Sequence, residues 1–237
     1  MSQAAEEILA RVDPRLRERV REELREWRAA GRAARPPGPR VVLVGHRGAG
    51  KTTLLPHVAA LLGREAVDLD AEIERALGRP IREVFAEDER RFRAVERERF
   101  QAVPAGTVVA AGGGFLALHS DLLGPGDTAV LVPVSFETYR ERLLADASRP
   151  RLRPHLTPEE EIRAVYEERE AIHGAMAEKV MGLAELLAGG GRMTALSSRA
   201  RLRPAMTLVR REPGARDMIY RVWRVPARGP IAVRRRA

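Results

Sequence analysis

Short apolar runs alternate with amphipathic segments through most of this 237-residue chain. Four of the runs are rich in β-branched side chains and have the length of buried strands. Segments with helical periodicity separate them, and this alternation predicts a parallel sheet covered by helices. The predicted strands are residues 41–44, 66–69, 107–111 and 129–132, and the predicted helices are residues 51–62, 71–77, 89–103, 136–146 and 158–181.

A separate amphipathic segment precedes the first strand. Residues 13–31 form a predicted helix with Asp13 as N-cap and Pro14 in its first position. Its apolar side chains recur every three or four residues and make one stripe, which needs a partner. That partner is either the chain's own main domain or a second copy of the chain. The Pro-rich residues 35–40 predict a short stiff linker, so residues 1–39 are interpreted as an N-terminal helical arm.

The end of the chain is distinguished by its charge. The formal net charge is +9, but residues 192–237 carry 13 arginines against two acidic residues. The remainder is close to neutral, so the charge does not indicate that the main domain, residues 40–190, binds nucleic acid. Residues 191–237 are expected to be a basic extension, disordered or loosely docked, with a candidate strand at 220–225. Any nucleic-acid contact through it would be non-specific.

Composition disfavours export and membrane insertion. The chain has no cysteine, which excludes disulfides and thiolate metal sites and suits a reducing cytoplasm. No apolar run approaches about 18 residues, and the N-terminus lacks the apolar core of a signal peptide. We therefore expect a cytoplasmic protein, as a monomer or weak dimer, without a membrane partner.

The first predicted strand leads into GHRGAGKT, which fits the pattern G-x-x-x-x-G-K-[ST] of a phosphate-binding loop. Its glycines allow backbone amides to point inward at an anion, and the following helix directs its positive end at the same place. The lysine would bind the β- and γ-phosphates and the first threonine Mg²⁺. The candidate nucleotide-binding residues here are Gly45, Gly48, Ala49, Gly50, Lys51, Thr52 and Thr53.

Asp68 and Asp70 lie at the end of the second predicted strand. Residues two apart on a strand share a face, so both carboxylates should point the same way at the carboxyl edge of the sheet. Open α/β sheets bind ligands at that edge. Near Mg-ATP, one acid can hold the metal while the other orients or deprotonates an attacking hydroxyl. The alternative is that Asp70 only caps the helix that begins at Ala71.

Glycines and arginines supply the remaining candidates. Residues 112–114 are three glycines after the third predicted strand, where backbone can approach a ligand closely or make a tight turn.

The Pro-stiffened segment SRPRLRPHL contains Arg149 and Arg153. It would either close over phosphates or form an exposed basic loop. Arg93 lies in a charged run that is typical of a solvated helix face. Arg169 lies in a later helix, followed by His173, which is interpreted as a surface or packing residue.

Taken in order, these segments resemble the shikimate kinase family. The similar motifs are GHRGAGKT, DLDAEIE, Phe92-Arg93 with Glu96, the triple glycine, Arg149-Pro150 and Arg169. The resemblance covers residues 40 to about 187 and implies a P-loop kinase fold, a three-layer α/β/α sandwich with a central parallel sheet. It implies transfer of the γ-phosphate of ATP to the 3-hydroxyl of shikimate, a step of aromatic amino acid biosynthesis, with Mg²⁺ as cofactor.

The resemblance also implies roles for individual residues. Lys51, Asp70 and Arg149 are the implied catalytic residues, and Arg149 also contacts the nucleotide. Thr52 and Asp68 are implied to organise Mg²⁺. The implied substrate-binding residues are Asp70, Arg93, Gly112, Gly113, Gly114 and Arg169.

The chain departs from the family's pattern at a few positions. Asp88 stands where Gly is usual, His173 stands where Tyr is common, and Arg153 is a rival lid residue. Two other functions stay open: a different small-molecule P-loop kinase, acting on gluconate or a nucleoside monophosphate, and a kinase-like sensor that binds a small acid without catalysis. Two arginines beside a triple glycine favour a hydroxy acid, because its carboxylate needs paired guanidinium donors. The catalytic-type residues favour an enzyme.

Overall fold

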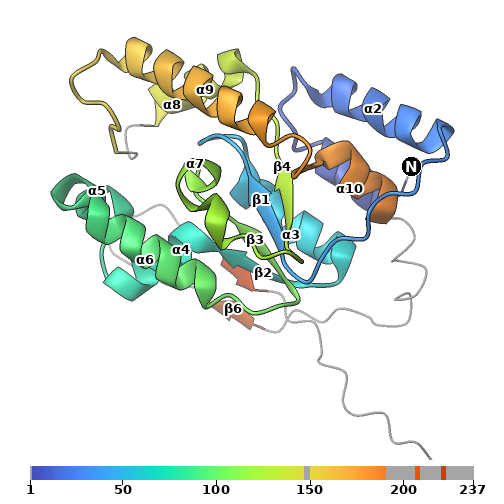
Figure 1. Ribbon diagram of the computed structural model, residues 1–237, viewed down its shortest axis with the longest axis horizontal. Helices are drawn as coiled ribbons and strands as arrows, with labels where there is room; N and C mark the ends of the chain where they lie inside the picture. Colours follow the sequence, from blue (N-terminus) through green and yellow to red (C-terminus); the bar gives the residue numbers. More distant parts are fainter. Residues whose placement is uncertain (1, 147–149, 191–205, 209–219, 223–237) are drawn as a thin grey trace, which may run out of the picture.

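The computed structural model describes residues 2–146, 150–190, 206–208 and 220–222. Its centre is a five-stranded parallel sheet in the order β2-β3-β1-β4-β5 (Figure 1). The strands are β1 (Val41–Val44), β2 (Glu65–Asp68), β3 (Thr107–Ala110), β4 (Thr128–Leu131) and β5 (Met181–Gly182). The four predicted strands are confirmed with shifts of one residue or less. The two-residue β5 is too short to leave a pattern in the sequence.

Helices follow most of the strands and cover the sheet. They are α3 (Lys51–Leu62), α4 (Leu69–Leu77), α5 (Ile81–Glu87), α6 (Glu89–Gln101), α7 (Phe115–His119), α8 (Phe136–Ala145), α9 (Pro158–Ala175) and α10 (Leu183–Gly190), with the 3₁₀ turn η1 (Ser120–Leu122). The helix predicted over residues 158–181 is wrong at its end, because α9 stops at Ala175 and the chain enters β5 at Met181. Its start is fixed by a capping box between Thr157 and Glu160.

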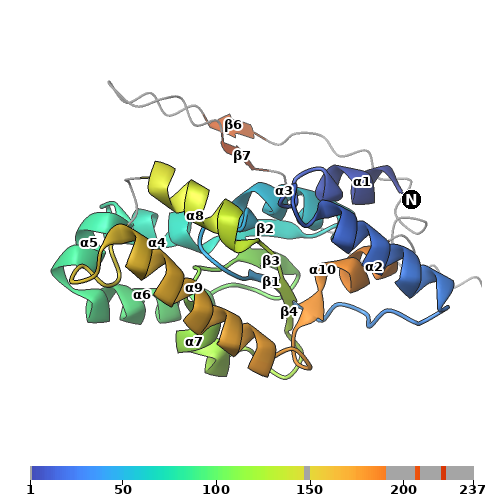
Figure 2. The same ribbon diagram turned by 90° about the horizontal axis from the view of Figure 1, so that it is seen from above.

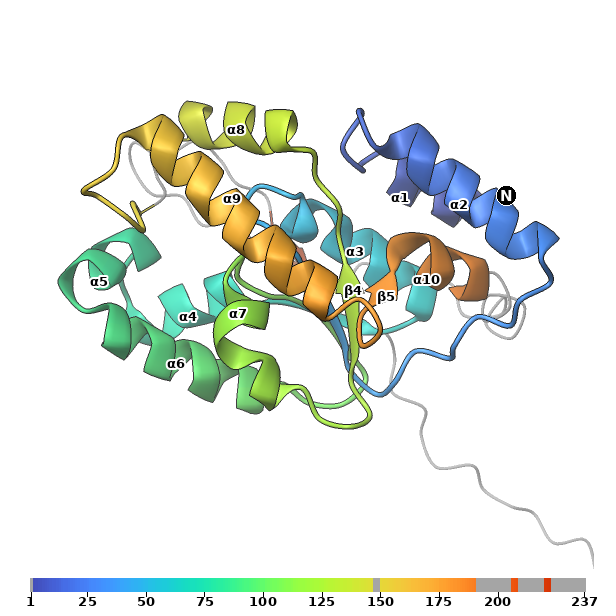
Figure 3. The same cartoon turned by 45° about the horizontal axis from the view of Figure 1, so that its top comes forward.

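Alternate side chains of the strands build two separate cores. Val41 and Leu43 of β1 face α3 and α10, whereas Val42 and Val44 face α4, α6 and α7. All four side chains are fully buried, because a parallel sheet with helices on both faces leaves neither face in water. The three-layer α/β/α arrangement predicted for the chain is thereby confirmed. Helix α9 crosses the sheet near its carboxyl edge, between α8 and α7 (Figures 1 and 3).

The N-terminal residues form two helices, α1 (Gln3–Leu9) and α2 (Arg17–Ala29), beside α3 and α10 (Figure 2). Helix α1 packs on α3 and α2 packs on α10, and Leu9 and Leu24 are fully buried in the same core. The apolar stripe predicted for this segment therefore covers the chain's own main domain. The predicted N-cap is wrong, since the cap position of α2 is Leu16.

Asp13 instead connects the N-terminal segment to α8. Its buried carboxylate accepts hydrogen bonds of 2.7 Å from both the amide and the hydroxyl of Ser135, the N-cap of α8. It also accepts one of 2.9 Å from the Thr138 hydroxyl. Burial by itself raises the pKa of Asp13, but the hydrogen bonds from Ser135, Arg15 and Thr138 outweigh it and hold the pKa below its ordinary value.

Asp13→Asn should lower the free energy of unfolding by about 1–3 kcal/mol at pH 7, because buried donors lose a charged acceptor. The folded-state pKa is depressed, so this stabilisation is present above about pH 4 and is lost as the pH falls through the folded pKa. The difference between wild type and variant in urea unfolding should therefore shrink in acid. Asp121→Asn, which removes an exposed partner of Arg97, is the control and should cost less than about 1 kcal/mol. A difference that stays constant down to acid pH would contradict the role of the charge.

Residues 35–40, predicted as a linker, are bonded to the main domain. Arg35 makes two bonds of 2.8 Å to the buried Glu185 of α10. Arg40 makes bonds of 2.9 and 2.5 Å to Asp127. The segment therefore runs along the surface of the main domain as an attached strap.

Of the basic extension, the structure describes an antiparallel pair, β6 (Met206–Leu208) and β7 (Tyr220–Val222). The strand predicted over residues 220–225 coincides with β7 in its first three residues. The rest of the extension lies outside the described residues. Within the described part of the chain, every helix is too short or too polar to cross a membrane.

Candidate active site

The phosphate-binding loop follows β1, and its glycines have the backbone angles that the motif requires. Gly45, Gly48 and Gly50 have φ of 131°, 68° and 93°, a region that side chains disfavour. At Gly45, a β-carbon would lie 2.7 Å from the carbonyl oxygen of Val132. Helix α3 begins at Lys51, so the free amides of its first turn belong to the loop and favour an anion there.

Side chains hold the loop from inside and outside. The buried Lys51 donates to the carbonyl oxygens of Gly45 at 2.9 Å and His46 at 2.6 Å. From α8, Arg142 donates to the Gly48 carbonyl at 2.5 Å. The loop's shape is therefore set by both its own lysine and a neighbouring helix.

The register of the sheet brings three motifs to one edge. Asp68, Ala110 and Leu43 occupy one row across β2, β3 and β1. The phosphate loop begins just after Leu43, and the triple glycine just after Ala110. The acidic pair, the glycines and the loop therefore meet at the carboxyl edge, where open α/β sheets bind ligands.

The predicted strand face shared by Asp68 and Asp70 is wrong. Strand β2 ends at Asp68, whose Oδ1 accepts from the amides of Asp70 at 3.1 Å and Ala71 at 3.3 Å. Asp68 is thus the N-cap of α4, and the alternative that Asp70 caps this helix is wrong as well. Asp70 lies in the first turn of α4, and its Oδ1 would be 3.5 Å from a β-carbon at Gly112. The helix start, not the strand, directs this carboxylate to the glycine turn.

The glycine turn makes room for side chains from three helices. A β-carbon at Gly112 would lie 2.7 Å from Oε1 of Glu96 on α6. One at Gly114 would lie 3.3 Å from Nη2 of Arg169 on α9 and 3.8 Å from Nη1 of Arg93 on α6. Together with Asp70 of α4, the turn therefore gathers two acidic and two basic groups from three helices.

Gly113 faces the phosphate loop. A β-carbon there would lie 2.6 Å from the amide nitrogen of Arg47 and 2.7 Å from its Cγ. The acceptor side and the phosphate loop are thus in direct backbone contact. Arg47 was not among the predicted site residues, because nothing in the loop motif marks its second variable position.

Gly113→Ala should displace the phosphate loop, because the clash is with backbone and cannot be relieved by a side-chain rotation. We expect ATP binding to weaken by about tenfold or more and the variant to lose about 1–3 kcal/mol of stability. Fluorescent-nucleotide titration and thermal unfolding would measure the two effects. Gly174→Ala on α9 is the control, since a β-carbon there meets nothing within 4 Å and should be neutral or stabilising. Unchanged nucleotide affinity in Gly113→Ala would contradict the contact.

Arg169 is a buried cation without a full set of partners. Only 8% of the residue is exposed, and among the described residues its Nη1 has no hydrogen-bond partner. Burial, together with repulsion from Arg47 and Arg93, lowers the pKa of Arg169 to about 10. A buried guanidinium with an unused donor, beside a second guanidinium, is suited to bind a carboxylate.

Arg93 is fixed by acidic residues on its own helix. Its Nη1 donates to the fully buried Glu96 at 2.8 Å, and Glu89 binds its other nitrogens. His119 approaches the same Glu96 oxygen at 3.0 Å. Burial raises the pKa of Glu96, but the bond from His119 and the charge of Arg93 outweigh it, so the carboxylate stays ionised. The expected solvated face is therefore wrong for Arg93 and Glu96, and His119 was not predicted at all.

An open cavity of about 650 Å³ borders this group. Arg93 lines it, and so does Leu118, whose Cδ1 would be 3.5 Å from a β-carbon at Gly114. Through Arg93 and Leu118, this open space reaches the side of the glycine turn, and its other lining residues belong to the end of α5 and the start of α6.

Comparison with known proteins shows which family this chain resembles over most of its main domain. The family model described as shikimate kinase matches residues 47–188. A shikimate kinase of Thermobifida fusca is 37% identical over 153 residues, 62% of this chain and 87% of its own. One of Desulforudis audaxviator is 39% identical over 134 residues, 54% of this chain and 70% of its own.

The chain belongs to the shikimate kinase family. Among solved structures, a shikimate kinase from Acinetobacter baumannii in complex with shikimate is 30% identical and superposes with a TM-score of 0.51, covering 69% of this chain and 96% of that one. The Aquifex aeolicus shikimate kinase, 24% identical, has a TM-score of 0.52 over 67% of this chain and 97% of that one, and shows the shared fold.

The lid of a shikimate kinase would correspond to the segment after α8. Arg149 lies outside the described residues, so its implied role stays a prediction. Arg151 is paired with Glu161, and Arg153 with Glu168 of α9. Arg47 donates to the carbonyl oxygen of Pro150 at 3.1 Å, so the base of this segment is attached to the phosphate loop.

The two other departures from the family pattern have structural explanations. Asp88 is the N-cap of α6, where its side chain accepts from the Arg91 amide at 3.0 Å, and its φ of −155° needs no glycine. His173 is buried and contacts Glu170 and His46. The interpretation of His173 as a packing residue thus agrees with its burial, but its contacts with Glu170 and His46 were not predicted.

Proposed function

We propose that this chain transfers the γ-phosphate of ATP to the 3-hydroxyl of shikimate, giving 3-phosphoshikimate and ADP. The observation that carries the proposal is the glycine turn, which lies against the phosphate loop on one side and against Asp70, Arg93 and Arg169 on the other. This arrangement puts a phosphate donor next to a site for an acid that carries hydroxyl groups. The absence of cysteine suits a cytoplasmic enzyme, and that localisation stays a prediction.

The donor half of the site uses the loop and the start of α3. The loop amides and Lys51 bind the β- and γ-phosphates of ATP. The exposed Thr52 hydroxyl and the Asp68 carboxylate at the strand end are oxygen ligands of the kind that Mg²⁺ prefers, so these residues fit the metal that the family implies. When bound, Mg²⁺ neutralises charge on the transferring phosphoryl group. Ala49, Gly50 and Thr53 complete the proposed nucleotide contacts.

The acceptor half uses the glycine turn and the three helices around it. Arg93 and Arg169 bind the carboxylate of the acid, and the backbone of Gly112–Gly114 contacts its ring hydroxyls. Asp70 holds the reacting hydroxyl in line with the γ-phosphate. Such positioning, together with electrostatic stabilisation, supplies most of the catalysis in phosphoryl transfer.

The chemical step is one direct displacement. The hydroxyl oxygen forms a bond to the γ-phosphorus while the bond to the β,γ-bridging oxygen breaks and ADP leaves. The proton of the hydroxyl passes to the Asp70 carboxylate. Arg149 is proposed to close from the lid and to stabilise the transferring charge.

A coupled ADP-release assay with ATP, Mg²⁺ and shikimate tests the proposal, and phosphorus NMR identifies the product. We expect turnover with shikimate and none above the ATPase background with gluconate or a nucleoside monophosphate. Shikimate methyl ester, which lacks the carboxylate charge, should be a poor substrate. No turnover with shikimate would refute the proposal, and shikimate binding without turnover would favour the sensor. A protein lacking residues 192–237 tests the extension, which is an accessory if activity is unchanged.

A further inference from the structure

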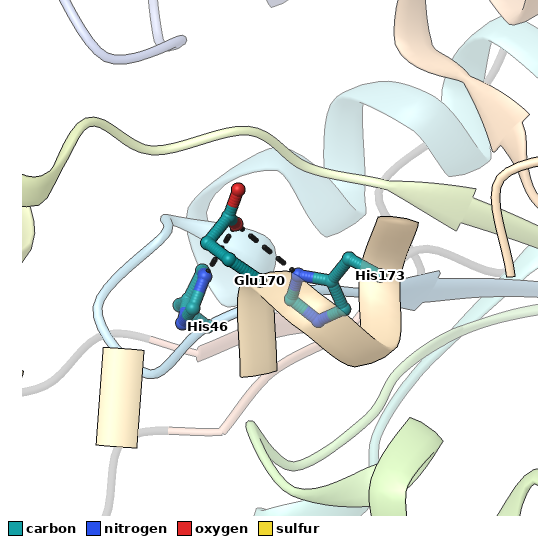
Figure 4. Close-up of side chains that lie close together, drawn as sticks. All are labelled: His46, Glu170 and His173. Atoms are coloured by element: carbon teal, nitrogen blue, oxygen red, sulfur yellow. Dashed lines mark hydrogen bonds and ion pairs between the residues drawn. The ribbon is translucent and has the colours of Figure 1, made fainter. Parts of the chain in front are cut away.

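Three side chains that the proposed reaction does not use form a cluster behind the phosphate loop. His46 is the second residue of that loop, and Glu170 and His173 lie one turn apart on α9 (Figure 4). The cluster joins the loop to the helix that carries Arg169. None of its members was singled out as a ligand from the sequence.

The three ligand atoms are close enough to share one ion. Oε1 of Glu170 is 2.7 Å from Nε2 of His46 and 3.4 Å from Nδ1 of His173, and all three atoms lie within 4.8 Å of one another. Ligand bonds of about 2.0–2.1 Å in a tetrahedral zinc site place ligand atoms about 3.4 Å apart. The separations in the cluster, from 2.7 Å to at most 4.8 Å, bracket that spacing.

The surroundings hold the imidazoles in place and keep them neutral. His46 is stacked on Tyr166, with ring centroids 4.3 Å apart and 9° between the planes, and Tyr139 packs against its edge at 5.2 Å. Burial lowers the pKa of His46 to about 4 despite its bond to Glu170, and burial also lowers the pKa of His173. Neutral imidazoles keep a lone pair for a metal. Glu170 is half exposed and leaves access from solvent.

We propose that His46, Glu170 and His173 bind a divalent transition-metal ion of the Zn²⁺ type. Two imidazoles and one carboxylate are the ligands of known zinc sites, and Glu-x-x-His on one helix face is a known arrangement of metal ligands. Mg²⁺, which prefers oxygen ligands, is not expected to bind here. The bound ion would attach α9 to the phosphate loop.

Nearby charges set the expected strength of the site. Arg169 and Lys51 act on the cluster as positive charges, and Glu170 is its single negative ligand. Repulsion from these cations opposes a divalent ion, so we expect an affinity in the micromolar range, weaker than in structural zinc sites.

The test is a titration of the chelator-treated, tag-free full-length protein with Zn²⁺ by calorimetry, in the absence of nucleotide. We expect one Zn²⁺ per chain, no Mg²⁺ binding, and a rise in the thermal unfolding temperature with Zn²⁺. Co²⁺ should give the visible absorption of a tetrahedral site with nitrogen ligands. Because activity is not measured, failure here is distinct from failure of the proposed kinase reaction.

Single-residue variants decide where the ion binds. His46→Asn, Glu170→Gln and His173→Asn should each weaken Zn²⁺ binding by about tenfold or more. The control variant His155→Asn, which changes an exposed histidine outside the cluster, should bind like wild type. Thermal unfolding without metal checks that each variant is folded. Equal affinity in all variants, or no binding by about 100 µM Zn²⁺, would overturn the proposal.

Discussion

Asp70→Asn should reduce phosphoryl transfer by about 10²- to 10⁴-fold while leaving ATP binding nearly unchanged. Asn keeps the size of the side chain and an oxygen acceptor, but it cannot take the proton of the attacking hydroxyl. Nucleotide binding should survive because of where Asp70 lies. It is in the first turn of α4, toward Gly112, whereas the phosphates are expected to bind the loop after β1. Steady-state kinetics and a fluorescent-nucleotide titration would measure the two quantities.

Glu72→Gln provides the matched control for Asp70→Asn. It removes the same charge from the same first turn of α4, but Glu72 is paired with Arg75 on its own helix. Its activity should stay within about twofold of wild type. If Asp70→Asn lost ATP binding and transfer to the same extent, Asp70 would have a structural role instead.

Arg169→Met should raise the KM for shikimate by about 10²- to 10³-fold, because the carboxylate of the substrate loses a buried charged partner. The affinity for ATP should change little. Arg169 is buried, and its pKa is lowered to about 10, so the folded protein holds this cation at a cost. Replacing it with an apolar side chain of similar length should therefore leave the thermal unfolding temperature unchanged or raise it.

The combination of weaker substrate binding with equal or higher stability is specific to a binding residue. A merely structural arginine would lower stability when it is removed. Arg163→Met, on the exposed side of the same helix, is the control and should change neither KM nor stability appreciably. A normal KM in Arg169→Met would mean that the carboxylate binds elsewhere.

Much of the donor site could be predicted because its motif is local. The strand Val41–Val44, the three glycines with positive φ and the helix from Lys51 follow each other along the chain, and each has a pattern of its own. The triple glycine could be located for the same reason. Phosphate binding was inferred from the loop motif itself, whereas shikimate as the acceptor was inferred only from the resemblance of the ordered segments to a known family.

The acceptor site was less predictable because its members are assembled by packing. Asp70 was assigned to a strand face, whereas the structure places it in the first turn of α4, two residues after the N-cap Asp68. The charged run around Arg93 was interpreted as solvated, yet Glu96 within it is fully buried. Composition alone cannot distinguish a charged helix that is fully solvated from one whose inner face forms buried ion pairs and contacts a charged ligand.

The sequence by itself determined four of the five strands of the central sheet, the phosphate loop and the glycine turn, because backbone angles and short apolar runs are properties of consecutive residues. Only the tertiary structure decided which of these lie together. The strand order β2-β3-β1 puts Asp68, Ala110 and Leu43 in one row, and the path of α9 brings Arg169 to the glycine turn and Glu170 to His46. These contacts depend on how whole elements bury their apolar faces against one another, and residues that are far apart along the chain carry no local signal of that.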